Sequence, residues 1–277
     1  MQKGNLTLDI KKIDRVDLLN DSSSIQIDEI INIEGAVIVR NVFSEDFIQE
    51  LKNNLQDCID EDEKKFGRDY VFYGMVHALM TRKKCFRTVV EDELVTEVMR
   101  KVLGNGAIVH AFNSSSLPPQ SSNFAGKIHV DSPRMVPGYI TNMVLTIALD
   151  DFTKENGAME IWPSSFDQKN PPAEEDFNNH MIRLDTVKAG DVILFNARCW
   201  HKGGMNTTQV WRHAIALTGC RPYMRQQFDF PKMFKKEDEA LFSESFKQLM
   251  GYFVRTPQSI EQFLLPSDQR LYKGGQE

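Results

Sequence analysis

The sequence predicts a mainly β fold with flanking helices, in the form of a jelly roll or a related barrel. Residues 107–220 form short, β-branched segments separated by turn residues, which is typical of an all-β region. The segments on either side carry apolar residues at helical spacing, first at 47–59 and 94–103 and again beyond 241. Seven or eight antiparallel strands of this kind favour a jelly roll.

The amino-terminal third contains one predicted strand and two predicted helices. The first 33 residues are polar and weakly patterned, whereas GAVIVRNVF (35–43) indicates a short buried strand. A helix should begin at Ser44, because serine is a favoured N-cap residue. One face of this helix carries Phe47, Ile48, Leu51, Leu55, Cys58 and Ile59. A second amphipathic helix covers 94–103 and should end at Gly104 as its C-cap.

The central region contains the candidate strands. They are IVHAFNSS, KIHVD, YITNMVLTIAL, AMEIWP, HMIRLDTV, DVILFNA and VWRHAIALTGC. Asn156-Gly157 and Gly203-Gly204 mark sharp turns between neighbouring strands. In TNMVLTIAL, alternate side chains point to opposite faces of the strand. The wholly apolar face should pack away from the functional site, and the other face should line that site. The apolar face contains Met143, Leu145, Ile147 and Leu149, and the other face contains Asn142, Val144, Thr146 and Ala148.

The carboxyl-terminal region returns to a helical pattern. One predicted helix presents Leu241, Phe242, Phe246, Leu249 and Met250 on one face. A further helix should have Thr256 as N-cap and Pro257 at its first position, followed by Ile260, Phe263 and Leu264. We expect these helices to cover the barrel or its mouth. Because no repeat or linker is visible, we expect a single domain over residues 1–277.

Composition excludes several classes of partner. Apolar residues make up 41% of the chain and charged residues 26%, which is typical of a soluble globular protein. A net charge of −6 argues against nucleic-acid binding. The amino terminus lacks a signal-peptide core, and MVLTIAL (143–149) is too short to span a membrane. Four scattered cysteines without a C-x-x-C pair fit a reducing cytoplasm. No feature indicates an oligomeric state.

The stretch KIHVDSPR (127–134) carries the first candidate for chemistry. Along a strand, His129 and Asp131 point to one face. Such a pair arises easily by chance among six histidines and 39 acidic residues. However, DVILFNARCW (191–200) predicts a buried strand that ends at His201, a second imidazole. Two histidines and one carboxylate on one side of a metal form the facial triad of non-haem iron(II) oxygenases, and the metal offsets the buried charge.

Arg212 is a candidate anion anchor. In a strand over 210–217, Arg212 shares a face with Ala214 and Ala216, so its guanidinium faces open space. Arginine can bind a carboxylate with two parallel hydrogen bonds, which lysine cannot do. An organic acid that chelates the metal at one end and reaches Arg212 at the other would fit the positions that a facial triad leaves free.

These residues resemble the phytanoyl-CoA dioxygenase family of iron(II)- and 2-oxoglutarate-dependent oxygenases. The resemblance rests on HVD (129–131), LDDFTKENGAMEIWPSS (149–165) and HKGGMNTTQVWRHAI (201–215). His201 and Arg212 are separated by eleven positions, as in the family pattern. EGAVIVRNVFSEDFIQEL and RTVVEDELVTEVMRKVLG are also similar to family segments, so the resemblance covers roughly 28–222. It implies a double-stranded β-helix, the cupin-like form of the jelly roll.

The resemblance also implies the roles of individual residues. His129, Asp131 and His201 would bind Fe(II), and Arg212 would bind the distal carboxylate of the cosubstrate 2-oxoglutarate. Thr146 and, with less support, Asn142 would lie beside that cosubstrate. The implied activity is the O2-dependent oxidation of a small-molecule substrate, by default its hydroxylation, with release of succinate and CO2. Secondary metabolism is one setting in which such enzymes act.

The chain departs from the family pattern at two positions. PSSF (163–166) lacks the histidine of the usual PGSH, and Gly203 stands where a serine is frequent. Halogenation is disfavoured, because the family halogenases lack the carboxylate that Asp131 provides. Two alternatives from the residues alone are a non-catalytic jelly roll that binds a small molecule and a cupin-like metal-dependent isomerase. Neither explains the offset between His201 and Arg212.

Overall fold

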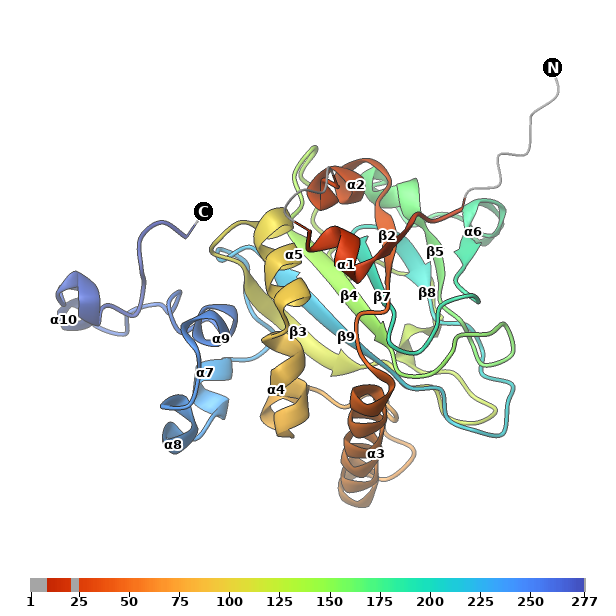
Figure 1. The fold of residues 1–277 in the computed structure, drawn as a ribbon, viewed down its shortest axis with the longest axis horizontal. Helices are drawn as coiled ribbons and strands as arrows, with labels where there is room; N and C mark the ends of the chain where they lie inside the picture. Colours follow the sequence, from red (N-terminus) through yellow and green to blue (C-terminus); the bar gives the residue numbers. More distant parts are fainter. Residues whose placement is uncertain (1–8, 21–24, 277) are drawn as a thin grey trace.

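Two sheets form the centre of the protein (Figure 1). The computed structural model describes residues 9–20 and 25–276. The larger sheet contains, in spatial order, β1 (Lys12–Asp14), β2 (Ala36–Arg40), β7 (Val192–Asn196), β4 (Asn142–Ala148), β9 (Ala214–Cys220) and β3 (Ile108–Ser114). The smaller sheet contains β6 (Ile182–Arg183), β5 (Glu160–Trp162) and β8 (Trp200–Lys202). Neighbouring strands are antiparallel except for β1 and β2.

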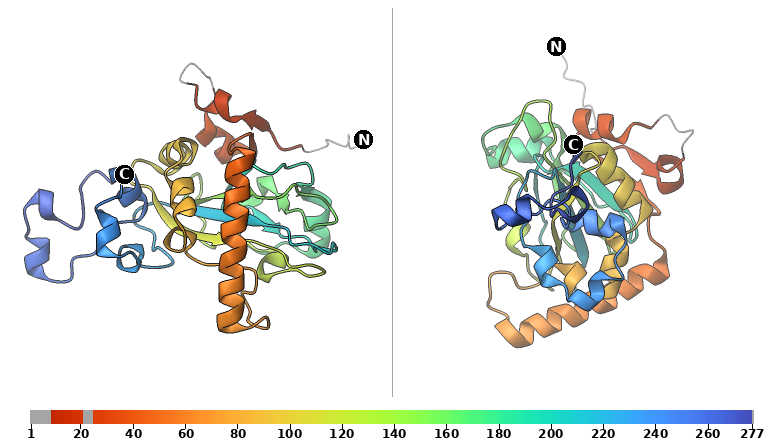
Figure 2. Two further views of the ribbon diagram at one scale, coloured as in Figure 1. Left: turned by 60° about the horizontal axis from the view of Figure 1, so that its bottom comes forward. Right: turned by 90° about the vertical axis from the view of Figure 1, so that its left-hand side faces the viewer.

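Helices flank the larger sheet, and a carboxyl-terminal arm projects beside it (Figures 1 and 2). The amino-terminal helices are α1 (Arg15–Leu18), α2 (Ile27–Ile33), α3 (Glu45–Phe66), α4 (Lys84–Val90) and α5 (Glu93–Leu103). They are followed by α6 (Glu174–His180), α7 (Phe230–Met233), α8 (Lys236–Glu239), α9 (Glu244–Leu249) and α10 (Ile260–Phe263). Short 3-10 turns are η1 (Leu79–Thr81), η2 (Phe124–Gly126), η3 (Pro163–Asp167) and η4 (Ser267–Gln269). No helix in the described ranges is long and apolar enough to cross a bilayer.

The two predicted amino-terminal helices are confirmed together with their caps. The Ser44 hydroxyl accepts a hydrogen bond from the Phe47 amide at 3.4 Å, so α3 begins as predicted. The predicted stripe of α3 is buried from Ile48 onward. α5 ends at Gly104, which has a positive φ of 89° that a glycine adopts without strain. These apolar faces pack against the sheet and form the main core.

The two faces of β4 separate two apolar clusters, as the alternation predicted. Met143, Leu145 and Ile147 belong to the core under the helices. Val144 and Ala148 belong to a second cluster between the two sheets. That second cluster also contains residues of β5 and β7, among them Ile161, Ile193 and Phe195. The face of β4 that carries Asn142 and Thr146 therefore points into the space between the sheets.

Several element assignments differ from those expected. Within the polar first 33 residues, for which no element was predicted, the structure contains β1, α1 and α2. Near the carboxyl terminus, α10 is capped by Ser259, whose hydroxyl accepts from the Gln262 amide, and not by Thr256. Leu241 is 82% exposed and lies outside any helix. Phe246, Leu249 and Met250 of the same predicted face are buried in the main core at α9. Leu241 and the apolar residues of α10 are exposed because no neighbouring element covers them, so their spacing carries no information on burial. The single domain stays a prediction.

Replacing Phe86 by alanine is expected to lower the free energy of unfolding by about 3–5 kcal/mol, because a fully buried ring leaves a cavity. Phe86 of α4 is fully buried and meets the Phe112 ring of β3 edge-on, with centroids 6.3 Å apart. Chemical denaturation of both proteins measures the difference. Phe66→Ala is the matched control, because Phe66 is 53% exposed and its loss should change the free energy by no more than about 0.5 kcal/mol. Equal losses in the two variants would contradict this packing.

Candidate metal centre

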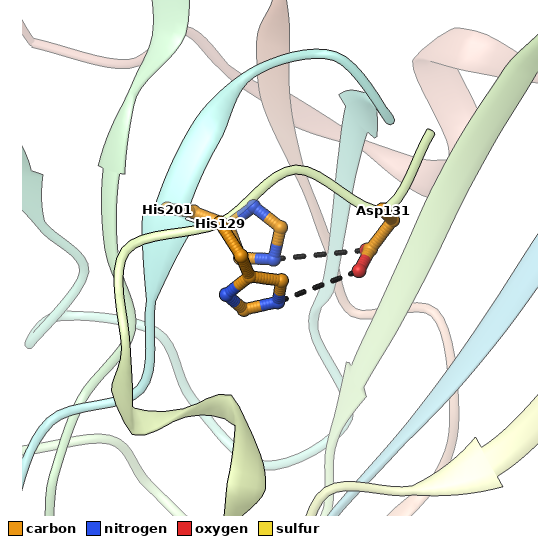
Figure 3. Close-up of side chains that lie close together, drawn as sticks. All are labelled: His129, Asp131 and His201. Carbon is orange, nitrogen blue, oxygen red and sulfur yellow. Dashed lines mark ion pairs between the residues drawn. The ribbon is translucent and has the colours of Figure 1, made fainter. Parts of the chain in front are cut away.

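Two imidazoles and one carboxylate converge between the sheets (Figure 3). One ligand atom of each of His129, Asp131 and His201 lies within 4.8 Å of the other two. Nε2 of His129 is 3.5 Å from Oδ1 of Asp131, and Nε2 of His201 is 3.6 Å from Oδ2. The two rings are adjacent, with centroids 4.2 Å apart. Residues that are 70 positions apart in the sequence therefore present donors to one point.

A single backbone bridge joins the two histidines. The His129 amide donates to the His201 carbonyl at 2.9 Å, and the His201 amide donates back at 3.0 Å. The predicted strand KIHVD is wrong as an element, because only His129 pairs. The alternation within it is nevertheless confirmed. Ile128 and Val130 pack against an apolar cluster of Trp162, Phe177 and Trp200, whereas the side chains of His129 and Asp131 face His201.

A tight turn between β7 and β8 holds the carboxylate. The predicted strand over 191–200 is interrupted, because β7 ends at Asn196 and the chain crosses to the smaller sheet. His201 is thus the central residue of β8 and not the end of a long strand. Within the turn, the Ala197 carbonyl accepts hydrogen bonds from the amides of Asp131, at 2.9 Å, and Ser132, at 3.0 Å. The crossing therefore brings Asp131 to His201.

Arg198 of the same turn is a residue that the sequence analysis did not select. Its side chain is buried, and its guanidinium donates only to backbone carbonyls of the described chain. Two of them belong to Ser132 and Pro133, which directly follow Asp131, at 3.3 and 3.4 Å. The others belong to η3 and its flank, at Phe166 and Gln168. A charged residue within the apolar run DVILFNARCW was the available signal.

Each histidine is held in the tautomer that a metal ligand requires. Nδ1 of His129 is 2.7 Å from the Lys127 carbonyl, and Nδ1 of His201 is 3.0 Å from the Cys199 carbonyl. Because a carbonyl only accepts hydrogen bonds, both Nδ1 atoms carry the proton. The Nε2 lone pairs therefore point toward Asp131 and are available to a metal ion.

The charge states of His201 and Asp131 also suit a cation. Burial lowers the pKa of His201 to about 4, so this imidazole is neutral at physiological pH. Burial raises the pKa of Asp131, but the two histidines outweigh it and the net shift is downward. For His129 burial lowers the pKa, and the Asp131 carboxylate more than reverses this. Asp131 remains ionised, with 30% of its side chain reachable by solvent, so the centre is accessible.

Arg212 is a buried guanidinium without a carboxylate partner in the described chain. It lies two residues before β9, so the predicted strand from 210 starts too early. Its Nη1 donates to the Ser115 carbonyl at 3.0 Å and its Nη2 to the Gly157 carbonyl at 3.3 Å. Nε is buried and has no hydrogen-bond partner among the described residues. Arg212 is only 3% exposed, so leaving its Nε donor without an acceptor costs free energy. This arrangement suits a bound ligand that supplies the acceptor.

The surroundings of Arg212 connect it to the same interior as the histidines. Burial lowers its pKa to about 10, which leaves it charged at neutral pH. Its Cζ lies 4.7 Å from the centre of the Phe152 ring, and Phe152 belongs to the cluster between the sheets. Phe195 of that cluster meets the His201 ring, with centroids 5.0 Å apart. Arg212 and His201 therefore border one apolar interior.

The two weaker candidates lie on the inner face of β4. Asn142 is buried, and its Oδ1 accepts a hydrogen bond from the Ser132 hydroxyl at 3.2 Å, next to Asp131. Thr146 is also buried, opposite Ala216 of β9 and Ile193 of β7. No hydrogen bond or ion pair in the described chain joins either residue to the three converging side chains.

The donor set fits a divalent transition metal. Two neutral imidazole nitrogens and one carboxylate on one side of a centre, with the other side open, are typical of non-haem iron(II) oxygenases. The chain also carries a buried guanidinium, that of Arg212, in the same interior. The arrangement of these side chains is therefore typical of a non-haem iron(II) oxygenase.

Comparisons with known proteins agree with this class. The family model described as phytanoyl-CoA dioxygenase (PhyH) matches residues 32–214. An uncharacterized protein of Mycobacterium tuberculosis is 26% identical over 93% of this chain and 97% of its own. The Fe(II)/2-oxoglutarate-dependent dioxygenase nvfF of Aspergillus novofumigatus is 36% identical over 34% of this chain and 30% of its own. The solved non-haem α-ketoglutarate-dependent carbocyclase SnoK from nogalamycin biosynthesis has a TM-score of 0.58, with 18% identity, over 72% of this chain and 84% of that one.

The chain belongs to the phytanoyl-CoA dioxygenase (PhyH) family, because the family model covers more than half of it. The family predicted from the sequence is therefore confirmed, and so is the enzyme class of dioxygenases. The structural likeness confirms the predicted cupin-like double-stranded β-helix with flanking helices.

Proposed function

We propose that the protein is an oxygenase in which His129, Asp131 and His201 bind Fe(II) and Arg212 binds the distal carboxylate of 2-oxoglutarate. When bound, the iron supplies the redox chemistry by which O2 places one oxygen atom in succinate, with loss of CO2, and the other in a small-molecule substrate. A substrate that receives this second oxygen atom is hydroxylated. The similarity to nvfF of Aspergillus novofumigatus, an Fe(II)/2-oxoglutarate-dependent dioxygenase, supports the choice of metal and cosubstrate.

In this proposal the residues of the chain bind the metal and the cosubstrate, orient both of them, and surround them with an apolar wall. His129, Asp131 and His201 occupy one side of the metal, which leaves the other side to ligands. Arg212 supplies a fixed charge in an apolar wall, where pairing with a carboxylate is stronger than in water. Asn142 and Thr146 face the same interior and would lie beside the cosubstrate. The observation that carries the proposal is the convergence of the three ligand atoms within 4.8 Å.

Anaerobic addition of Fe(II) and 2-oxoglutarate to metal-free protein is expected to produce a metal-to-ligand charge-transfer band in the visible spectrum. A chelator should remove both the band and the activity, and renewed Fe(II) should restore them. Succinate release in the presence of O2 and candidate substrates measures turnover. A chelator-insensitive activity, or the absence of the band, would contradict the proposal and favour a binding protein or an isomerase, neither of which consumes O2.

Arg198→Met is expected to weaken Fe(II) binding by about 10–100-fold, the usual cost of removing a group that orients a metal ligand. Arg198 donates to the two carbonyls that follow Asp131, and methionine keeps the size but offers no donor. Metal titration of the apoprotein measures the effect without turnover. Arg183→Met is the matched control, because Arg183 pairs with Glu160 in the smaller sheet and touches no metal ligand. Equal metal affinity in the Arg198 variant would show that the turn holds Asp131 unaided.

A further inference from the structure

A cavity of about 910 Å³ lies within the carboxyl-terminal region, and Ile108 of β3 is the one lining residue that belongs to the larger sheet. One wall is formed by the segment 222–232 and the other by residues of 251–272. Figure 1 shows that the arm from α7 to α10 projects beside β3, the edge strand. None of the residues that line the cavity belongs to the metal centre or is Arg212. The function proposed above therefore does not account for this cavity.

The cavity is strongly basic within an acidic chain. Its charged lining residues are Arg225, Asp229, Lys232, Arg255 and Arg270. Asp229 and Lys232 neutralise each other in an ion pair of 2.8 Å. The three arginines have no carboxylate within 4.0 Å in the described chain, although the whole protein carries a net charge of −6. A concave site lined by charges of one sign concentrates ions of the opposite sign.

The backbones of Arg225 and Arg255 are held by hydrogen bonds, whereas their guanidinium groups have no partner among the described residues. The Arg225 carbonyl accepts from Nδ1 of His110 at 2.8 Å, and the Gln227 amide donates to the His110 carbonyl at 2.8 Å. The Arg255 amide donates to the Leu271 carbonyl at 3.0 Å. Within the described residues, the side chains of Arg225 and Arg255 form no hydrogen bond, and that of Arg270 donates only to the Leu265 carbonyl. Guanidinium groups that have an ordered backbone but no carboxylate partner are suited to binding an anion.

Aromatic rings form a second part of the lining. Tyr223, Phe263 and Tyr272 line the cavity and are between 51% and 65% exposed. Large exposed rings that share one cavity are unusual on a soluble protein and mark a binding surface. A flat or apolar group can pack on such rings while guanidiniums hold a charged group beside it.

We propose that this cavity binds an organic phosphate that carries a ring, with the phosphate held by Arg225, Arg255 and Arg270 and the ring by Tyr223 and Tyr272. Phosphate fits better than a single carboxylate, because it offers more acceptor oxygens and more than one negative charge to three planar donor groups. The proposal does not depend on the metal centre, because its lining residues are separate.

Calorimetry on the full chain without added metal tests the site with inorganic pyrophosphate and with adenosine diphosphate. We expect saturable binding of both, weaker at higher salt, and tighter binding of the nucleotide. Arg225→Ala and Arg255→Ala should each weaken pyrophosphate binding about tenfold, the worth of one charged hydrogen bond. Neither side chain forms a hydrogen bond or ion pair within residues 9–20 and 25–276, so both variants should fold normally. Tyr272→Ala should weaken binding of the nucleotide and leave that of pyrophosphate unchanged.

Arg100→Ala is the matched control, because Arg100 is an exposed arginine of α5 that pairs with Glu97 and lies outside the cavity. It should bind both probes like the unmodified protein. If pyrophosphate fails to bind, or binds all arginine variants equally, the anion site is overturned. If Tyr272→Ala leaves nucleotide binding unchanged, the assignment of the ring is overturned. Because no step requires iron or turnover, failure here is distinct from failure of the oxygenase proposal.

Discussion

His201→Ala is expected to abolish Fe(II) binding at concentrations that saturate the unmodified protein and to lower turnover by more than about 100-fold. His201 is the most deeply buried of the three converging residues, and its Nε2 faces Asp131 across 3.6 Å. Alanine leaves two donors on an open centre and removes the imidazole that the Cys199 carbonyl orients. Metal titration and succinate release measure the two effects.

His180→Ala is the control for this variant. His180 ends α6 and stacks on Trp162, with ring centroids 4.4 Å apart, but it is not part of the metal centre. Its loss should leave metal affinity and turnover close to those of the unmodified protein. Full activity of the His201 variant would show that the third ligand is misassigned, whatever the control does.

Arg212→Leu is expected to raise the apparent KM for 2-oxoglutarate by about 30-fold or more, the cost of removing one partner of a buried charge pair. The guanidinium has no other anionic partner in the described chain, so a distal carboxylate would lose its counter-charge. Fe(II) affinity without cosubstrate should stay unchanged, because Arg212 is not a metal ligand. Steady-state kinetics and anaerobic metal titration separate these two readouts.

Arg212→Lys should fall between the unmodified protein and the leucine variant, because lysine keeps the charge but not the two parallel donors. Arg183→Leu is the control for removal of an arginine, since Arg183 pairs with Glu160 outside this interior. An unchanged affinity for 2-oxoglutarate in the leucine variant would mean that another cation binds the cosubstrate.

Local signals predicted those parts of the fold that neighbouring residues determine. The cap at Ser44, the glycine stop at Gly104 and the two faces of β4 depend on residues a few positions apart, and all three are confirmed. The arm shows the limit of such signals. Ile260 and Phe263 have the spacing of a buried face, yet they are 72% and 65% exposed because no element covers them.

The residues of the candidate metal centre were predictable from the sequence, but the path of the chain that brings them together was not. The motifs selected His129, Asp131 and His201, because the side-chain types and their offsets are visible in the sequence. Their roles as ligands remain a prediction. The placement of the chain that brings them together is not visible. In the sequence, β7 and β8 form one apolar run, and Arg198 is the one charged residue in the interior of that run.

The sequence by itself determined the family of the chain, the caps of its longer amino-terminal helices and the two faces of its central strand, and it proposed the side chains that would carry the chemistry, because those inferences depend on residue type and short-range spacing. The tertiary structure alone decided that the chain leaves one sheet at Asn196 and enters the other at Trp200, and that Arg198 and Arg212 are buried without a carboxylate partner among the described residues. Burial and pairing depend on residues far apart in the chain, so no local pattern encodes them.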